Sequence, residues 1–287
     1  MEFLQPATWA EALAMKAERP DSVPIAGGTD LMVELNFDRR RPPAVLDLTR
    51  IEELTDWTPD GDRLRVGARV TYARVIEELG DRLPALALAS RTVGSPQIRN
   101  RGTLGGNLGT GSPAGDALPP LLAADAEVEV ASHAAGVRRI PMRQFCLGPK
   151  RTALRPDELI AAVHVPAAAG PQQFAKVGTR NAMVIAVVSF ALHLDLASGR
   201  ARTGTGIGSA GPTPLRAEAA ERFLDEALAR GGLTQAATAR FGELVAGAAR
   251  PIDDVRGTAA YRRHALAVLA RRTLAWAWAE ARERAWS

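Results

Sequence analysis

The chain of 287 residues contains a single cysteine, Cys146, and only four histidines. One cysteine cannot form a disulfide within the chain, and it cannot supply the several thiolates that an iron–sulfur cluster requires. The histidines show no spacing typical of metal ligands, and the sequence has no H-E-x-x-H motif. We therefore expect no metal site formed by this chain alone, and we interpret Cys146 as a small apolar residue of the core.

Aromatic residues are also scarce, at 5% of the chain, and long apolar runs are absent. Nucleic-acid grooves interleave basic residues with stacking rings, whereas the net charge of +4 here comes from arginines spread along the chain, so we expect no nucleic-acid partner. The longest apolar run, 182–192 with one serine, is too short to span a bilayer. The N-terminus lacks the features of a secretory signal, and we predict a cytoplasmic protein.

The length of the chain and the pattern of its segments favour two domains. Up to residue 166, short strands such as VPIAGG, AVLDL, RLRVG and ELIAAVHVP alternate with helices, one of them with Thr71 as its expected N-cap. The stretch AAAGPQ (167–172) has the composition of a linker. We predict one domain over residues 1–172 and a second over 173–287. The second is expected to begin with a strand, a turn and a further strand or helix, and to end in helices at 214–230, 233–249 and 258–285.

A literal G-x-G-x-x-G motif occurs at Gly206, Gly208 and Gly211. In dinucleotide-binding folds the third glycine opens a helix, but here Pro212 and Pro214 follow at once and delay any helix. We interpret this segment as a loop between a strand and the helix near Pro214. No glycine cluster is followed by a P-loop lysine, so nucleoside triphosphate chemistry is not predicted.

Two other glycine segments, PIAGGTDLMVEL (24–35) and TLGGNLGTGSPAGD (103–116), are candidates for ligand binding. Paired glycines let the backbone approach a ligand, and amides at the start of a helix lack a partner within it, which is typical of an anion site. Taken alone, the first could equally be an ordinary tight turn. Together, two backbone-rich loops on separate strands could hold a diphosphate without a lysine. Asn107 could donate from its side chain, and Asp30 and Asp116 suit the hydroxyls of a ribose or ribityl chain.

The two segments in tandem resemble those of the FAD-binding medium subunits of molybdenum hydroxylases, a family that includes bacterial xanthine, carbon monoxide and aldehyde dehydrogenases. FAKVGTRNAMVIAVVS is similar to the start of that family's C-terminal domain, and the N-terminal MEFLQPATWAEALAMKAERP resembles actinobacterial xanthine dehydrogenase subunits. The resemblance extends over essentially the whole chain. It implies an α+β fold, with a two-part FAD-binding domain of the vanillyl-alcohol oxidase (PCMH) type. A smaller C-terminal domain of sheet and helices, of the carbon monoxide dehydrogenase flavoprotein type, would follow.

The resemblance also assigns roles to residues. It places the FAD diphosphate between a first loop and a second loop, formed by Ala26, Gly27, Gly28, Thr29 and Asp30 and by Thr103, Leu104, Gly105, Gly106 and Asn107. It further implies that Asp116 binds sugar hydroxyls, that Ile160 makes a backbone contact to the flavin, and that Lys176 is a basic residue near the ring system. For Lys176, the alternative is an exposed lysine at a strand end.

The function implied by the resemblance is electron relay. A molybdopterin-binding large subunit would oxidise the substrate at its molybdenum cofactor, and a small subunit with two [2Fe–2S] clusters would carry the electrons. This chain would hold the FAD that passes them to NAD or another acceptor, within a heterohexamer that is a dimer of heterotrimers, and would need no catalytic acid–base residue. Two alternatives remain: an autonomous flavin oxidase of the same fold, and a scaffold module without flavin.

Overall fold

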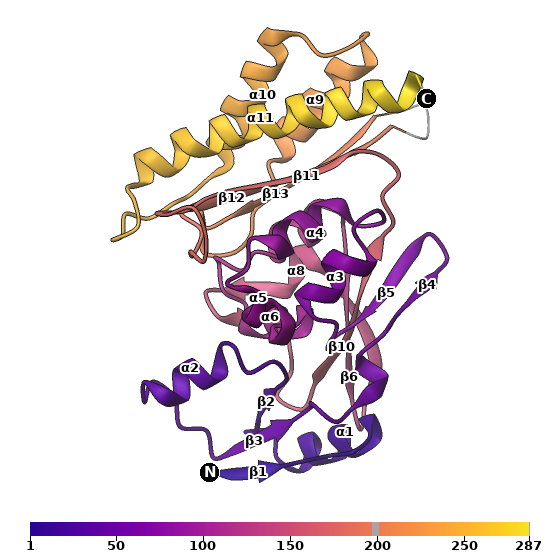
Figure 1. Ribbon diagram of the computed structural model, residues 1–287, viewed down its shortest axis with the longest axis vertical. Helices are drawn as coiled ribbons and strands as arrows, with labels where there is room; N and C mark the ends of the chain where they lie inside the picture. Colours follow the sequence, from indigo (N-terminus) through magenta and orange to yellow (C-terminus); the bar gives the residue numbers. More distant parts are fainter. Residues whose placement is uncertain (197–200, 287) are drawn as a thin grey trace.

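The computed structural model describes residues 1–196 and 201–286 and stacks three regions along its long axis (Figure 1). The N-terminal region is a parallel sheet of order β1-β3-β2, formed by Glu2–Leu4, Ala44–Asp47 and Val23–Ile25. Helix α1 (Trp9–Glu18) packs on it through the buried Ala12, and the short helices α2 (Leu31–Asn36) and η1 (Glu52–Leu54) complete the region.

The middle region is built on an antiparallel sheet of order β4-β5-β10-β6-β7. Its strands are Trp57–Asp60, Arg63–Gly67, Leu159–Pro166, Glu127–Ser132 and Gly136–Pro141. The inner face carries alternating apolar residues such as Val66, Val163 and Val128, because successive side chains of a strand point to opposite faces. Helices cover this face: α3 (Tyr72–Glu78), α4 (Pro84–Arg91), α5 (Pro96–Arg101), α6 (Leu104–Thr110), α7 (Leu118–Ala123) and α8 (Met142–Phe145). A small hairpin follows α8, with strands β8 (Cys146–Gly148) and β9 (Arg151–Thr152).

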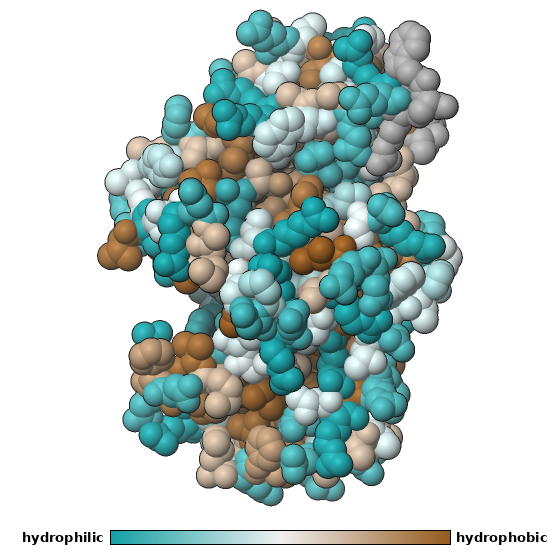
Figure 2. Space-filling model, in the orientation of Figure 1, coloured by the Kyte–Doolittle hydropathy of each residue, from teal (hydrophilic) through white to brown (hydrophobic). Residues whose placement is uncertain are grey.

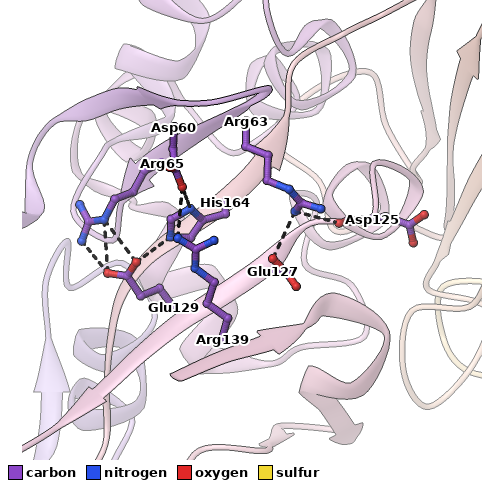
Figure 3. Close-up of polar contacts among 8 residues, drawn as sticks. All are labelled: Asp60, Arg63, Arg65, Asp125, Glu127, Glu129, Arg139 and His164. Atoms are coloured by element: carbon purple, nitrogen blue, oxygen red, sulfur yellow. Dashed lines mark hydrogen bonds and ion pairs between the residues drawn. The ribbon is translucent and has the colours of Figure 1, made fainter. Parts of the chain in front are cut away.

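The outer face of this sheet is polar, and a network centred on His164 joins its strands (Figure 3). The two ring nitrogens of His164 lie 3.0 Å from an oxygen of Asp60 and 2.6 Å from an oxygen of Glu129. Arg65 binds Glu129 over 2.7 Å, and Arg139 binds Asp60 over 3.1 Å. Burial raises the pKa of Glu129, but the hydrogen bonds from Arg65 and His164 outweigh this effect and leave the pKa below its usual value.

The C-terminal region is an antiparallel sheet of order β11-β12-β13, formed by Gln172–Val177, Val188–Asp195 and Arg202–Gly208. One face is covered by α9 (Glu218–Ala229), α10 (Gln235–Ala248) and α11 (Ala259–Trp286) (Figure 1). The other face packs against α4 and α7 of the middle region, where Phe174 lies among alanines. Across residues 1–196 and 201–286, none of the helices combines the length and the apolar character that a membrane crossing would need.

The predicted α+β fold is confirmed, but two local interpretations were wrong. The segment 103–110 is not a loop, because Thr103 caps helix α6 and the fully buried Leu104 and Leu108 anchor it. Gly206 and Gly208 do not lie in a loop either, since both belong to β13. At Gly206 the strand backbone packs so tightly against the carbonyl of Pro119 that no β-carbon would fit. The following helix begins only at Glu218, beyond the prolines.

Candidate functional site

A cavity of about 640 Å³ lies where the N-terminal sheet, helices α5 and α6 and the segment between β11 and β12 meet. Its volume falls within the range of small-molecule sites, about 300–1,000 Å³. In Figure 2 the surface is indented on the left, between the lobe that carries α2 and the rest of the molecule. Both glycine segments line this cavity, although about 80 residues separate them in the sequence.

The first glycine segment, residues 26–30, connects the end of β2 to the start of α2. Among the described residues, none accepts a hydrogen bond from the backbone amides of Gly27, Gly28, Thr29 or Asp30. Gly28 adopts a positive φ of 77°, a conformation that favours glycine. These four successive residues line the cavity, and unpartnered backbone amides in such a row are typical of anion-binding sites.

The second glycine segment is different, because its amides already have partners within the chain. The amides of Leu104 and Gly105 donate to the carbonyls of Val70 and Ala68. The amide of Gly106 donates to the Thr103 hydroxyl over 3.0 Å, and the amide of Asn107 donates to the Thr103 carbonyl. The amides of residues 104–107 are therefore not free to bind a ligand, in contrast to those of the first segment. Helix α6 offers the cavity side chains instead, above all Asn107, whose buried Oδ1 has no hydrogen-bond partner among the described residues.

Each glycine segment makes one close backbone contact with a neighbouring part of the chain, at Gly27 and at Gly105. A β-carbon on Gly27 would overlap the carbonyl of Arg101, and one on Gly105 would lie 2.7 Å from the carbonyl oxygen of Ala68. Thr110 adds a link from its hydroxyl to Asp30 over 2.9 Å. The cavity wall is thus bare backbone at two places where any side chain would displace it.

Asp116 and Lys176 form a buried ion pair beside the cavity, with side chains that are 11% and 6% exposed and Nζ 2.7 Å from Oδ2. Burial raises the pKa of Asp116, and the charge of Lys176 opposes that rise. The other oxygen, Asp116 Oδ1, is buried and has no hydrogen-bond partner among the described residues. The alternative of an exposed Lys176 was therefore wrong.

Eleven of the thirteen predicted site residues line the cavity, and Leu104 and Lys176 do not. Leu104 is fully buried in the core, while the ammonium of Lys176 lies behind Asp116. Ile160 lines the cavity at the point where β10 shifts register against β6.

Sequence reasoning missed several residues of the cavity wall. The basic residues Arg40, Arg69 and Lys150 line it, and so do Tyr72 and the segment 183–185. Glu34 pairs with Lys150 over 2.6 Å and with Arg40 over 3.7 Å. Burial, followed by the charges of Asp116 and Asp30, raises the pKa of Tyr72 well above its usual value, so its hydroxyl stays neutral. Of these residues, Arg69 and Tyr72 could have been suspected from the sequence, because they lie shortly after the predicted strand RLRVG.

Comparison with known proteins finds two family models. Residues 1–168 match the FAD binding domain in molybdopterin dehydrogenase, and residues 173–277 match the CO dehydrogenase flavoprotein C-terminal domain. The chain is 35% identical over 230 residues to the putative xanthine dehydrogenase FAD-binding subunit XdhB of Escherichia coli, covering 77% of this chain and 78% of that protein. It is 32% identical over 280 residues to the nicotine 6-hydroxylase medium subunit of Paenarthrobacter nicotinovorans, covering 96% of each.

Solved structures show the same similarity. A chain of the carbon monoxide dehydrogenase from Hydrogenophaga pseudoflava superposes with a TM-score of 0.90 at 28% identity, covering 98% of each chain. A chain of quinoline 2-oxidoreductase from Pseudomonas putida 86 also gives a TM-score of 0.90, at 27% identity and with 98% of each chain covered.

Proposed function

The chain belongs to the family of FAD-binding subunits of molybdopterin dehydrogenases, and from this premise we propose that it is the electron-transferring FAD subunit of a molybdenum hydroxylase. The observation that carries the proposal is the row of four unpartnered amides at Gly27–Asp30 on the wall of the cavity. Unpaired amides at the approach to a helix are available to a ligand, and they match the charge of a diphosphate.

The remaining residues also fit FAD. The buried oxygens Asn107 Oδ1 and Asp116 Oδ1 have no partner among the described residues, and each would accept a hydrogen bond from a ligand hydroxyl or amine. Arg69 supplies positive charge at the wall, and its guanidinium is fixed by a 2.7 Å hydrogen bond to the carbonyl of Ile51. We propose that residues 26–30 hold the diphosphate, and that the free oxygens of Asn107 and Asp116 accept hydrogen bonds from hydroxyl or amine groups of the cofactor.

FAD supplies the redox chemistry when bound, because its ring system accepts and releases electrons. The chain's own task is to bind and orient the cofactor and to exclude water from it. The apolar residues Val93, Leu154 and Ile160 on the cavity wall serve the last of these purposes. No residue needs to act as a catalytic acid or base.

The partner chains follow from the relatives, several of which are named as medium chains or medium subunits. We propose a molybdopterin-binding large subunit and a small [2Fe–2S] subunit as partners, in a dimer of heterotrimers in the cytoplasm, with NAD or another acceptor receiving the electrons. The domain division between residues 172 and 173 belongs to the same proposal. It is supported by the separate sheets that end at Pro166 and begin at Gln172.

The proposal is tested with the purified chain reconstituted with FAD under anaerobic conditions. We expect a flavin absorption spectrum, and no bleaching when xanthine, an aldehyde or carbon monoxide is added, until the large and small subunits are restored. Bleaching by any of these substrates with the chain alone would establish an autonomous oxidase. Failure to take up FAD at all would leave the scaffold alternative.

A further inference from the structure

The ammonium group of Lys176 contacts oxygen atoms from three segments that are distant in sequence. It donates to Asp116 Oδ2 over 2.7 Å, to the carbonyl of Thr92 over 2.9 Å and to the carbonyl of Val184 over 3.2 Å. A lysine ammonium has three N–H bonds and no acceptor. All three donors of Lys176 are therefore used inside the protein, and none remains for a ligand.

Two of the three acceptors belong to the cavity wall. Asp116 lines the cavity and keeps one buried oxygen without a partner among the described residues. Val184 lies in the segment 183–185, which also lines the cavity. Lys176 thus joins an acidic wall residue to a separate stretch of wall, and the carbonyl of Thr92 anchors both to the end of helix α4.

The segment 183–185 has few other restraints. It lies between β11 and β12 without regular structure, and Met183 adopts a positive φ of 49°, which is uncommon outside glycine. Met183 and Ile185 are 55% and 52% exposed. Arg180 binds the carbonyls of Ala182 and Met183, but Arg180 is itself exposed and comes from the same loop. Among the described residues, Lys176 is the one that donates a hydrogen bond to this segment from outside its own loop.

We propose that Lys176 is a positioning residue for FAD, which holds Asp116 and the segment 183–185 against the cofactor without contacting it. This inference rests on the proposed function, because it takes FAD as the ligand of the cavity. It differs from the role that the family resemblance implied, in which the lysine itself lies near the ring system.

Removing the ammonium has two consequences. The carbonyl of Val184 loses its donor, so the segment 183–185 opens more often. Asp116 loses the cation that opposes the effect of burial, while the neutral Tyr72 remains nearby, so burial drives the carboxyl group to take up a proton. A protonated Asp116 is a weaker acceptor for a ligand hydroxyl, and FAD affinity then rises with pH as the carboxyl group ionises.

The first test uses the unmodified chain, which has three lysines, Lys16, Lys150 and Lys176. An amine-reactive reagent is applied with and without FAD, and the modified peptides are identified by mass spectrometry. We expect Lys150, whose side chain is 62% exposed, to react, and Lys176 to stay unmodified in both states. Modification of Lys176 that FAD prevents would make it a direct ligand and overturn the proposal.

The second test compares Lys176→Met with Lys16→Met, which removes another buried lysine bound to two backbone carbonyls. In Lys176→Met without FAD, hydrogen exchange of residues 182–187 should be about tenfold faster. Its FAD dissociation constant should rise about tenfold near pH 6 and recover at higher pH, whereas the double variant Lys176→Met with Asp116→Asn should show no such pH dependence. Lys16→Met should show neither the faster exchange nor the pH dependence.

The two tests distinguish a failure of the positioning role of Lys176 from a failure of the proposed FAD-binding function. If the unmodified chain binds no FAD, the proposed function fails. The hydrogen exchange of residues 182–187 in Lys176→Met then still tests whether Lys176 restrains the segment 183–185. If the unmodified chain binds FAD and Lys176→Met matches it in exchange, affinity and pH profile, the positioning role is wrong.

Discussion

The carbonyl oxygen of Arg101 occupies the place that a β-carbon on Gly27 would need. Gly27 belongs to the segment that leaves β2, and Arg101 is the last residue of α5, so this contact sets how closely the N-terminal lobe approaches the middle region. The cavity lies along this junction. A β-carbon at Gly27 would push the two backbone segments apart and so change the shape of the cavity.

Gly27→Ala should therefore move the N-terminal region away from the middle region. We expect a loss of about 1–3 kcal/mol in the free energy of unfolding, because neither backbone segment can move aside without cost, and a rise of at least about tenfold in the FAD dissociation constant. Gly247→Ala is the matched control, since Gly247 is exposed on α10 and no atom lies within 4 Å of its added β-carbon. That variant should keep its FAD affinity and gain up to about 1 kcal/mol of stability. Equal FAD affinity in both variants would contradict the role of the contact.

Asn107→Ala should weaken FAD without weakening the fold. The substitution removes a buried oxygen that lacks a partner among the described residues, and alanine is a better helix former in α6. We expect the dissociation constant, measured by quenching of flavin fluorescence, to rise about 10- to 100-fold, with an unchanged or higher melting temperature for the FAD-free chain. Asn36→Ala, at an exposed position at the end of α2, should change neither. A large loss of stability in Asn107→Ala would show that the side chain serves the fold instead.

Thr205→Val and Thr203→Val should have opposite effects, although both side chains are buried on β13. The Thr205 hydroxyl donates to Glu221 over 2.6 Å and accepts from the amide of Ala217 over 2.8 Å. Its removal should cost about 2–3 kcal/mol. The Thr203 hydroxyl has no partner among the described residues, so its replacement should be neutral or stabilise by up to about 1 kcal/mol. Urea unfolding measures both, and similar losses in the two variants would contradict the assignment.

Cys146 should react slowly with alkylating reagents in the folded chain. Burial raises the pKa of its thiol to about 11 from an ordinary value near 9. Two pH units correspond to about a hundredfold less thiolate, so iodoacetamide at pH 8 should modify the folded chain about a hundredfold more slowly than the urea-unfolded chain. The folded state holds this proton more tightly, so its contribution to stability is present below pH 9 and is lost as the pH rises toward 11. The single thiol makes mass spectrometry a direct readout, and equal rates in the two states would contradict the burial.

Local chemistry made much of the fold and part of the site predictable. Thr71 caps its helix as predicted, with its hydroxyl accepting from the amide of Arg74. The first glycine segment was interpreted correctly as an approach to a helix start, because unpartnered amides follow directly from that position. The second was misjudged as a loop, because glycine disfavours helices, whereas burial of Leu104 and Leu108 overrides that propensity.

The rest of the site was not predictable from local patterns. Lys176 reaches Asp116, and the segment 183–185 reaches the cavity, only because β11 and β12 pair and then pack against α4 and α7. Lys150 pairs with Glu34, although the two residues are 116 positions apart in the sequence. Such encounters depend on tertiary packing, which spacing within one segment does not encode.

The order of the strands has a consequence for synthesis on the ribosome. β10 is the central strand of the five-stranded sheet, yet it is the last of the five to be translated. A nascent chain that ends before Leu159 can form the hairpins β4–β5 and β6–β7, but nothing joins them. The wall segment 183–185 emerges later still, after about two thirds of the chain. We therefore expect a fragment truncated before β10 not to bind FAD, because it lacks both the central strand and this part of the cavity wall.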